Sequence, residues 1–234
     1  MNGSPMSAAT LSVIVPTLNA ARTLGKTLDA LAPQRPGLIK EVVIVDGGSG
    51  DETIDIAQKL GCRVVRASKG RGTQLRCGAA AATGDWLLFL HADTRLNADW
   101  ATAIADFVAR PGSGQFAAVF QFRLDDIRTR ARALEVVVSF RTRWLGLPYG
   151  DQALVLSRKF YDDIGGFSDI PLMEDVDMIR RIGRRRLTIL PAYAVTSAQR
   201  YRRDGYMRRS LRNLTCLALY FLGVPPARIA KFYG

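Results

Sequence analysis

Short apolar runs and segments with apolar residues at helical spacing alternate along the first part of the chain. The apolar runs predict strands with their turns at 11–19, 41–51, 62–67 and 85–94, of which the first two, rich in β-branched residues, are expected to be buried. Apolar residues at helical spacing, closed by glycine or proline, predict helices at 20–34, 52–61 and 70–84. Four strands separated by three helices are typical of a parallel sheet that is covered by helices.

The pattern becomes less regular after this point. We expect helices at 96–111, 128–146 and 173–186, an alternating strand with one wet face at 114–124, and turns with a short strand at 147–167. From Arg200 onward the chain is basic and then apolar, which predicts one or two amphipathic helices. The sequence contains no internal repeat and no low-complexity linker. We therefore expect a flexible segment 1–10, one α/β domain over 11–198 and a helical tail over 199–234.

Composition adds information about partners and compartment. With 234 residues, 48% of them hydrophobic, the chain is long and apolar enough for a sizeable core. The 33 basic and 21 acidic residues give a net charge of +12, which favours nucleic acid, anionic lipid or phosphorylated small molecules without choosing among them. Three cysteines without a C-x-x-C spacing predict reduced thiols and no zinc site, and hence a cytoplasmic setting.

Neither a signal peptide nor a transmembrane helix is expected. The N-terminal residues lack a basic region followed by an apolar one. The apolar stretch LTCLALYFLGV near the C-terminus is much shorter than the roughly 20 residues that a bilayer span needs. Attachment to a membrane surface stays open.

Polar residues stand at the ends of three predicted strands. Asn19 follows the first strand and Asp46 ends the second, while His91 and Asp93 follow the fourth. Ligands of open α/β sheets bind beyond the carboxyl ends of the strands. Each residue alone also suits an ordinary turn, as Asp46 before two glycines does. Together they predict a ligand site at one edge of the sheet.

The sequence LLFLHADTR places the single histidine, His91, and a carboxylate, Asp93, at the end of an apolar strand. An imidazole and a carboxylate can hold a divalent cation and leave positions for water and phosphate oxygens, as Mg²⁺ and Mn²⁺ prefer. The imidazole suits Mn²⁺ somewhat better. The alternatives are a core histidine that hydrogen-bonds the backbone and a carboxylate that caps a helix or a turn.

Two further segments carry candidate chemistry. The loop KGRGTQ at 69–74 brings glycine, lysine and arginine to a helix start, which favours phosphate, although it is not a Walker A loop. Glu174, Asp175 and Asp177 are crowded, and like charges in proximity raise one pKa, as a general base requires. These acids can equally complement the helix dipole.

The segment GDQALVLSR contributes a candidate acceptor site. Asp151 and Gln152 could hydrogen-bond an acceptor, or they could simply form a turn before the next strand. The sequence alone leaves both readings open.

Four segments together resemble a family 2 glycosyltransferase with the GT-A fold. In chain order, from Leu11 to Ile182, they are LSVIVPTLNAARTLGKTLDAL, EVVIVDGGSGDET, GRGTQLRCGAAAATGDWLLFLHADT and GGFSDIPLMEDVDMIRRI. The HADT sequence is most similar to the subgroup of radical-SAM/selenodomain-associated glycosyltransferases. The resemblance implies an α/β, Rossmann-like, mostly parallel sheet flanked by helices. It also implies inverting transfer of a sugar from a nucleotide-diphospho-sugar, favoured to be UDP-linked, to an acceptor hydroxyl with Mn²⁺ or Mg²⁺.

The resemblance assigns roles to individual residues. The residues expected on the donor side are Pro16, Thr17, Asn19, Asp46, Arg71 and His91. Among them, Asp46 would contact the base and Arg71 would reach the diphosphate. Asp93 would be the direct metal ligand. Asp175 would be the catalytic base, with Glu174 beside it.

One position departs from the family pattern. His91 stands where the family has the first aspartate of its D-x-D motif, a residue that contacts the ribose or a metal-bound water. Histidine can donate to a ribose hydroxyl or bind Mn²⁺ directly, so both roles stay open. The same histidine disfavours a haloacid-dehalogenase phosphatase, whose nucleophile is that first aspartate.

The acceptor is not named by the sequence. The arginine-dense segment 180–212, followed by apolar residues, suits an anionic membrane surface at its cytoplasmic face and a lipid-linked acceptor. The alternative is a helix packed on the catalytic domain. Rival classes are a basic nucleic-acid-binding protein, a nucleotidyltransferase and a nucleotide-sugar-binding relative without transfer. No nucleic-acid motif is present, so we expect no nucleic-acid partner.

Overall fold

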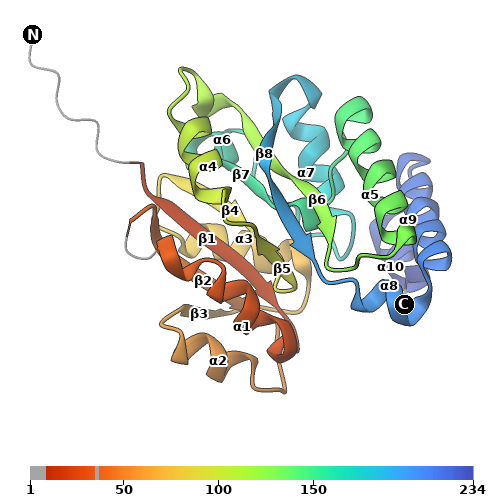
Figure 1. The fold of residues 1–234 in the computed structure, drawn as a ribbon, viewed down its shortest axis with the longest axis horizontal. Helices are drawn as coiled ribbons and strands as arrows, with labels where there is room; N and C mark the ends of the chain where they lie inside the picture. The colour runs from red at the N-terminus through yellow and green to blue at the C-terminus, as the bar shows by residue number, and fades with distance from the viewer. Residues whose placement is uncertain (1–8, 35–36, 234) are drawn as a thin grey trace, which may run out of the picture.

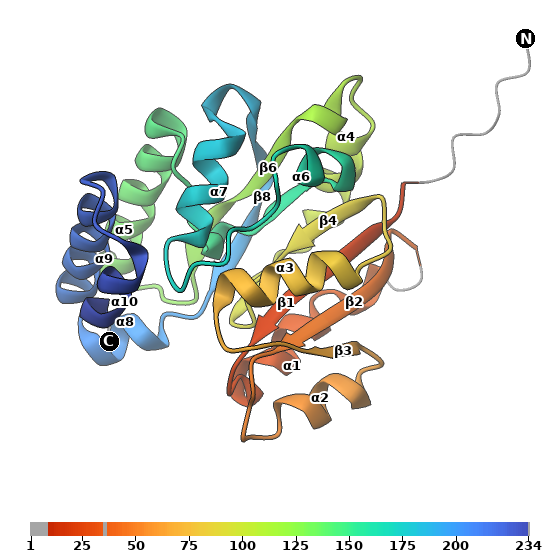
Figure 2. The same ribbon diagram turned by 180° about the vertical axis from the view of Figure 1, so that it is seen from behind.

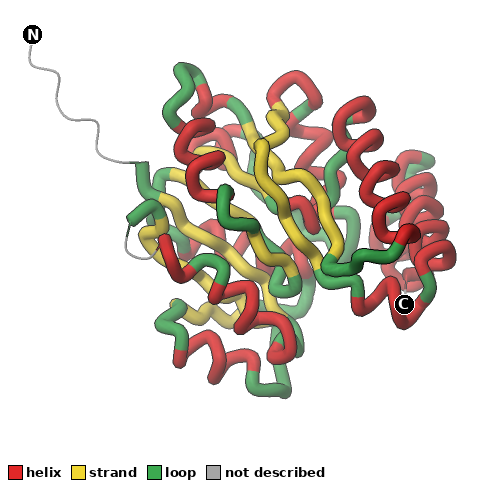
Figure 3. The backbone as a smooth tube through the Cα atoms, viewed as in Figure 1, coloured by secondary structure: helices red, strands yellow, loops and turns green. Residues whose placement is uncertain are grey.

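A mixed β-sheet crosses the molecule and carries helices on both faces (Figures 1 and 3). The computed structural model describes residues 9–34 and 37–233. Most of the segment 1–10, which we expected to be flexible, lies outside the described residues. The expected α/β architecture is confirmed.

The first half of the sheet follows the sequence pattern. Its four parallel strands lie in the order β3-β2-β1-β4, namely β1 (Leu11–Thr17), β2 (Ile39–Asp46), β3 (Arg63–Arg66) and β4 (Trp86–Phe89). The connecting helices are α1 (Ala21–Asp29), with the short 3₁₀ turn η1 (Ala32–Gln34), α2 (Thr53–Lys59) and α3 (Arg71–Ala81). Gly78 lets α3 lie close to the sheet, because a Cβ there would collide with Ile14 and Val45.

The second half of the sheet contains antiparallel pairs. It continues from β4 in the order β7-β6-β8-β5, namely β7 (Leu154–Ser157), β6 (Ala117–Leu124), β8 (Leu187–Thr196) and β5 (Thr94–Leu96). Among the described residues the sheet has four parallel and three antiparallel pairings. The sequence did not predict β8, which pairs parallel with β6 and antiparallel with β5.

Two layers of helices enclose the sheet. Helices α1 and α2 pack on one face with α4 (Trp100–Val108). Helix α3 covers the other face with α6 (Arg158–Asp163) and α7 (Glu174–Ile182), as Figure 2 shows. Helix α5 (Thr129–Phe140) packs on β6 and continues into the π-helical turn η3 (Arg141–Leu145). The remaining short turns are η2 (Ser113–Gln115), η4 (Gly150–Gln152) and η5 (Arg184–Arg186).

The tail forms three helices where the pattern predicted one or two. They are α8 (Gln199–Asp204), α9 (Tyr206–Phe221) and α10 (Pro226–Tyr233). Cys216, Leu217 and Ile229 form a small core with Met173 and Val176 at the start of α7. The tail is therefore packed on the α/β domain. No helix in the described part of the chain is both long and apolar enough to cross a membrane.

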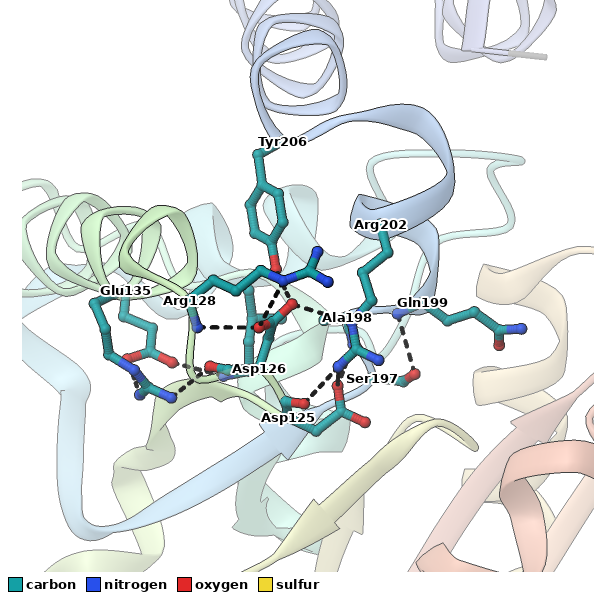
Figure 4. A network of polar contacts seen from close by, with 11 residues as sticks. Asp125, Asp126, Arg128, Glu135, Ser197, Ala198, Gln199, Arg202 and Tyr206 are labelled. Carbon is teal, nitrogen blue, oxygen red and sulfur yellow. Dashed lines mark hydrogen bonds and ion pairs between the residues drawn. The ribbon is translucent and has the colours of Figure 1, made fainter.

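Polar contacts also attach the tail to the loop that follows β6 (Figure 4). The Asp126 carboxylate accepts hydrogen bonds from Arg202 Nε at 3.0 Å and from the Tyr206 hydroxyl at 2.9 Å. Asp125 accepts from the backbone N–H of Ala198 at 2.6 Å. The backbone N–H of Arg128, together with the Tyr206 and Arg202 contacts, lowers the pKa of Asp126 to about 2 against the effect of desolvation. Both carboxylates thus fix α8 and the start of α9.

Candidate functional site

A cavity opens where the ends of β4 and β8 meet α7 and the tail. Its lining combines acidic, basic and aromatic side chains from five regions of the chain. The charged, polar and aromatic side chains of the lining include Arg71, His91, Asp93, Tyr149, Asp151, Asp175, Arg200, Tyr201, Arg209, Asn213 and Tyr233. The structure therefore gathers segments that are far apart in the sequence around one solvent-accessible space.

His91 and Asp93 lie in the turn between β4 and β5. This turn is fixed because the Thr94 N–H donates to the His91 carbonyl at 3.1 Å and the Ser197 N–H donates to the Asp93 carbonyl at 2.9 Å. Burial, aided by the nearby Arg71, lowers the pKa of His91 to about 4. The imidazole is consequently neutral at physiological pH and keeps a lone pair for a metal ion or a hydroxyl donor.

Gly150 allows the His91 ring to approach the backbone. A Cβ at this position would lie 2.7 Å from His91 Nε2 and 3.5 Å from Asp175 Oδ2. Any larger residue would therefore displace the His91 ring. The glycine before Asp151 has a steric role that the sequence alone did not reveal.

The residues present suit a divalent cation that is completed by ligand oxygens. Asp93 has one ion-pair partner among the described residues, Arg200, at the long distance of 3.8 Å. No group of three or more histidine, cysteine or acidic side chains in the described part of the chain could hold a metal by itself. A carboxylate and a neutral imidazole, with a buried unpaired oxygen of Asp151 on the same cavity, fit a cation that also binds water and phosphate.

Glu174 and Asp175 start α7 but have different surroundings. Glu174 is 1% exposed, and its Oε1 accepts from Arg71 Nη1 at 3.2 Å while Oε2 has no hydrogen-bond partner. Burial raises the pKa of Glu174 to about 7 although Arg71 opposes the shift. Asp175 instead faces the cavity, and its two oxygens accept the N–H groups of Gly150 and Val176, each at 2.8 Å.

Asp151 and Gln152 are neighbours in sequence but serve different surroundings. Asp151 lines the cavity, its Oδ1 is buried without a partner, and burial raises its pKa to about 6. Gln152 accepts from Thr142 Oγ1 at 2.8 Å and donates to the Phe120 carbonyl at 3.0 Å. The structure therefore places Asp151 on the cavity wall, whereas the Gln152 amide is used inside the protein.

Asp46 lies in its own turn and does not line this cavity. Its carboxylate accepts the N–H groups of Gly48 and Ser49 at 2.9 and 2.8 Å. The hydroxyls of Thr17 and Ser49 donate to its other oxygen. Burial would raise the pKa of Asp46, but these hydrogen bonds hold it below the ordinary value. A carboxylate accepts about four hydrogen bonds, so a nucleotide base would have to displace one of these donors.

The other expected donor residues are divided between two places. Asn19 is exposed in a second cavity that shares Asp93 and Arg200 with the first, so the two cavities adjoin. Pro16 is half-buried in β1, and the Thr17 hydroxyl contacts Asp46. The structure thus brings Asn19, Arg71, His91 and Asp93 to neighbouring cavities, whereas Pro16, Thr17 and Asp46 line neither of them.

Sequence reasoning missed the contribution of the tail to the site. Arg200, Tyr201, Arg209, Asn213 and Tyr233 all line the main cavity. A usable signal was the spacing within α9, where Arg209 and Asn213 share a helix face with the buried Tyr206, Cys216 and Leu217. Polar residues on the buried face of an amphipathic helix indicate a polar cavity or an ion pair beneath it.

Comparison with known proteins identifies the class of this chain. The model of the family described as glycosyl transferase family 2 matches residues 12–169. The chain is 43% identical over 111 residues to the PGL/p-HBAD biosynthesis glycosyltransferase of Mycobacterium tuberculosis, a match covering 44% of this chain and 43% of that protein. It is 34% identical over 93 residues to glucosyl-3-phosphoglycerate synthase of Mycolicibacterium smegmatis, covering 36% and 31% of the two chains. These matches span less than half the length of either relative.

A solved structure supports the fold. Glucosyl-3-phosphoglycerate synthase from Mycobacterium tuberculosis, in complex with Mn²⁺, uridine diphosphate and phosphoglyceric acid, superposes with a TM-score of 0.63 at 21% identity. The match covers 93% of this chain and 80% of the other. The chain therefore belongs to glycosyl transferase family 2, and its α/β fold is the GT-A fold expected from the resemblance. The finer assignment to the radical-SAM/selenodomain-associated subgroup stays a prediction.

Proposed function

We propose that this protein transfers a sugar from a nucleotide-diphospho-sugar, UDP-linked, to an acceptor hydroxyl with inversion at the sugar carbon. The observation that carries the proposal is the meeting of Arg71, neutral His91 and Asp93 with the carboxylates of Asp151 and Asp175 around one cavity. The solved relative named above was captured with Mn²⁺ and uridine diphosphate, which supports the same class of donor here.

Arg71 and Asp93 serve the leaving group. The nucleoside diphosphate gains negative charge as its bond to the sugar breaks, and Arg71 lies on the cavity to receive that charge. Asp93 and His91 would hold Mn²⁺ or Mg²⁺, which when bound neutralises the diphosphate. Glu174 holds the Arg71 guanidinium from behind and so orients it.

Asp175 serves the nucleophile. The acceptor oxygen forms a bond to the sugar carbon as the carbon–phosphate oxygen bond breaks, and the acceptor proton passes to the Asp175 carboxylate. Hydrogen bonds from Gly150 and Val176 fix this carboxylate and still leave one acceptor position on each oxygen. A fixed base on the cavity wall suits a single direct displacement.

The adjoining cavity at Asn19 suits the nucleoside. The side-chain oxygen Oδ1 of Asn19 accepts the Gly50 N–H at 2.9 Å, and the backbone N–H of Asn19 donates to Ser49 Oγ at 2.9 Å. Asp46 binds the same Ser49, so we propose that Asp46 shapes the nucleoside site through this turn. Pro16 and Thr17, at the end of β1, would help to shape the same nucleoside site.

Nucleotide binding tests the proposal directly. In a thermal-shift panel of UDP, GDP and CDP with and without Mn²⁺, we expect a metal-dependent shift with UDP. A ligand at a hundredfold excess over its Kd adds about 2.7 kcal/mol, which for a chain of this size is a shift of several degrees. A flat panel would contradict the proposal. UDP binding without release of UDP from any UDP-sugar would indicate a binding protein that does not transfer.

We also propose that the enzyme works at an anionic membrane surface in the cytoplasm. Exposed apolar side chains form a stripe along α9, in which Met207 is 85%, Leu211 66% and Leu222 79% exposed. A second exposed group lies on α5 and η3, beside α9 in Figures 1 and 2, and consists of Val136, Val137, Phe140, Trp144 and Leu145. Residues 199–234 contain eight basic residues and one acidic residue. This charge complements anionic lipid and opposes pairing with a second copy.

Vesicle sedimentation tests this surface. We expect binding to phosphatidylglycerol vesicles that weakens with salt and falls about tenfold or more in a Leu211→Glu/Leu214→Glu variant, because each buried leucine contributes about 1.5–3 kcal/mol. Leu60→Glu is the control, since Leu60 is 39% exposed at the end of α2, far from α9. Equal binding of all variants, or no binding of the wild type, would exclude membrane docking by this surface.

A further inference from the structure

The tail wall of the main cavity has a polar group that the proposed chemistry leaves unused. Arg209 on α9 is only 8% exposed, and it lines the cavity. Its Nη1 donates to Asp204 at 3.1 Å and its Nη2 to the Tyr233 hydroxyl at 3.3 Å. Nε is buried and has no hydrogen-bond partner. An unsatisfied N–H on a buried guanidinium is costly unless a ligand accepts it.

The charge around Arg209 is not balanced by the protein. Asp204 contacts Arg203 at 2.7 Å, Arg209 at 3.1 Å and Arg212 at 3.5 Å. One carboxylate is thus shared by three guanidinium groups. Arg200 stands on the same cavity and pairs only loosely with Asp93. The tail side of the cavity therefore carries an excess of positive charge.

Unpaired hydrogen-bond acceptors lie on the same cavity. Asn213 is one helical turn beyond Arg209, and its Oδ1 is buried without a partner. Asp151 Oδ1 is also buried and has no hydrogen-bond partner. These oxygens suit hydroxyl donors, whereas the Arg209 N–H suits an anion. Because Asp125 and Asp126 hold the tail in place, the wall is preorganised (Figure 4).

We infer that α9 and α10 form an anion subsite for the acceptor, in which Arg209 binds a phosphate or carboxylate group of a hydroxyl-bearing substrate. This inference rests on the proposed transfer reaction and narrows its acceptor to anionic hydroxy compounds. The acceptor hydroxyl meets Asp151 and Asp175, and the anionic group meets Arg209. Tyr233, at the end of α10, orients the guanidinium through its hydroxyl.

Glycerol 3-phosphate is a suitable probe because it carries hydroxyls and one phosphate. Calorimetric titrations are made with UDP and Mg²⁺ at saturation, so that the diphosphate site is filled, and again without nucleotide. We expect saturable binding of glycerol 3-phosphate and no binding of glycerol in both series. Arg209→Gln is expected to weaken binding about tenfold or more, because it removes a charged hydrogen-bond donor to the anion.

Arg209→Gln could lose affinity simply because it misfolds, so two further variants test the subsite independently. Asn213→Asp keeps the arginine but places a negative charge in the subsite, and it should weaken the probe about tenfold or more by repulsion. Arg228→Gln removes an exposed positive charge from α10 and should leave the affinity unchanged. The inference would be overturned if Arg209→Gln and Asn213→Asp, both folded, bound glycerol 3-phosphate with near-wild-type affinity. It would also be overturned if Arg228→Gln lost as much affinity as they do.

A second set of titrations with the same variants shows whether the bound phosphate belongs to a lipid headgroup or to a small molecule. Vesicles of phosphatidylglycerol present a phosphate in a lipid headgroup, and inorganic phosphate presents it alone. Arg209-dependent binding of either probe supports the subsite and names its source. If the protein binds none of these probes, and does not bind glycerol 3-phosphate either, the inference is wrong. The UDP shift is measured separately, so a failed subsite and a failed donor proposal give different results.

Discussion

Replacing Asp93 by alanine is expected to abolish sugar transfer and to remove the metal-dependent part of donor binding. Asp93 is the carboxylate that lies on both adjoining cavities, and it is fixed by the turn between β4 and β5. Without it, a bound cation would lose the carboxylate proposed to hold it, and the leaving diphosphate would lose charge compensation. Losing one such contact commonly costs about 10²–10³ in rate. Transfer is measured as UDP release, and donor affinity by calorimetry with and without Mn²⁺.

Two comparisons make this result specific. Asp106→Ala removes an exposed carboxylate from α4, far from the cavity, and should leave rate and affinity unchanged. Arg200→Gln removes the loose partner of Asp93 and should preserve metal-dependent binding of UDP. Asp93→Ala with wild-type turnover, or with donor binding that still responds to Mn²⁺, would contradict the metal assignment.

The sequence predicted the parts of the fold that local periodicity determines. Strands β1, β2 and β4 are largely buried, so their apolar runs are nearly continuous and easy to recognise. β8 was missed because LTILPAYAVT contains an interior proline and only four of its ten residues are buried. Its pairing with β6 is a long-range event that no local pattern reports.

The sequence predicted those site residues that directly follow a strand. His91 and Asp93 lie beyond β4, as the switch from apolar to polar residues indicated. Asp46 also lies at a strand end, but only the structure reveals that Thr17 and Ser49 already occupy its oxygens. Hydrogen-bond satisfaction depends on neighbours in space, which spacing along the chain does not encode.

The tail could not be interpreted from its composition. Its arginines left open an anionic membrane surface or a helix packed on the catalytic domain, and composition does not reveal that Arg209 is buried. β8 delivers the chain to Ser197 beside Asp93, and α8 then turns across the cavity. The tail therefore joins two surfaces, one that faces the reacting groups and one that is apolar and exposed. Such an arrangement would bring the cavity close to the membrane surface proposed above.

Replacing Asp175 by asparagine is expected to lower kcat by about 10²–10⁴, the usual contribution of a positioned general base. Asparagine keeps the size and shape of the side chain, but its single carbonyl oxygen can replace only one of the two carboxylate oxygens that accept the N–H groups of Gly150 and Val176. UDP affinity with Mn²⁺ should stay near the wild-type value, because Asp175 touches the acceptor side. Rapid-quench turnover and calorimetry with UDP separate these two effects. Asp55→Asn, an exposed substitution on α2, is the matched control.

Asp151 is the rival for the same role, and pH separates the two carboxylates. Burial raises the pKa of Asp151 to about 6, so this group is ionised above that pH and protonated below it. If Asp151 takes the acceptor proton, kcat falls as the pH drops through about 6, Asp151→Asn abolishes transfer, and Asp175→Asn retains it. We expect instead that Asp175→Asn lowers kcat by about 10²–10⁴ at every pH. Asp151→Asn should retain measurable turnover with weaker acceptor binding, because its unpaired oxygen faces the acceptor.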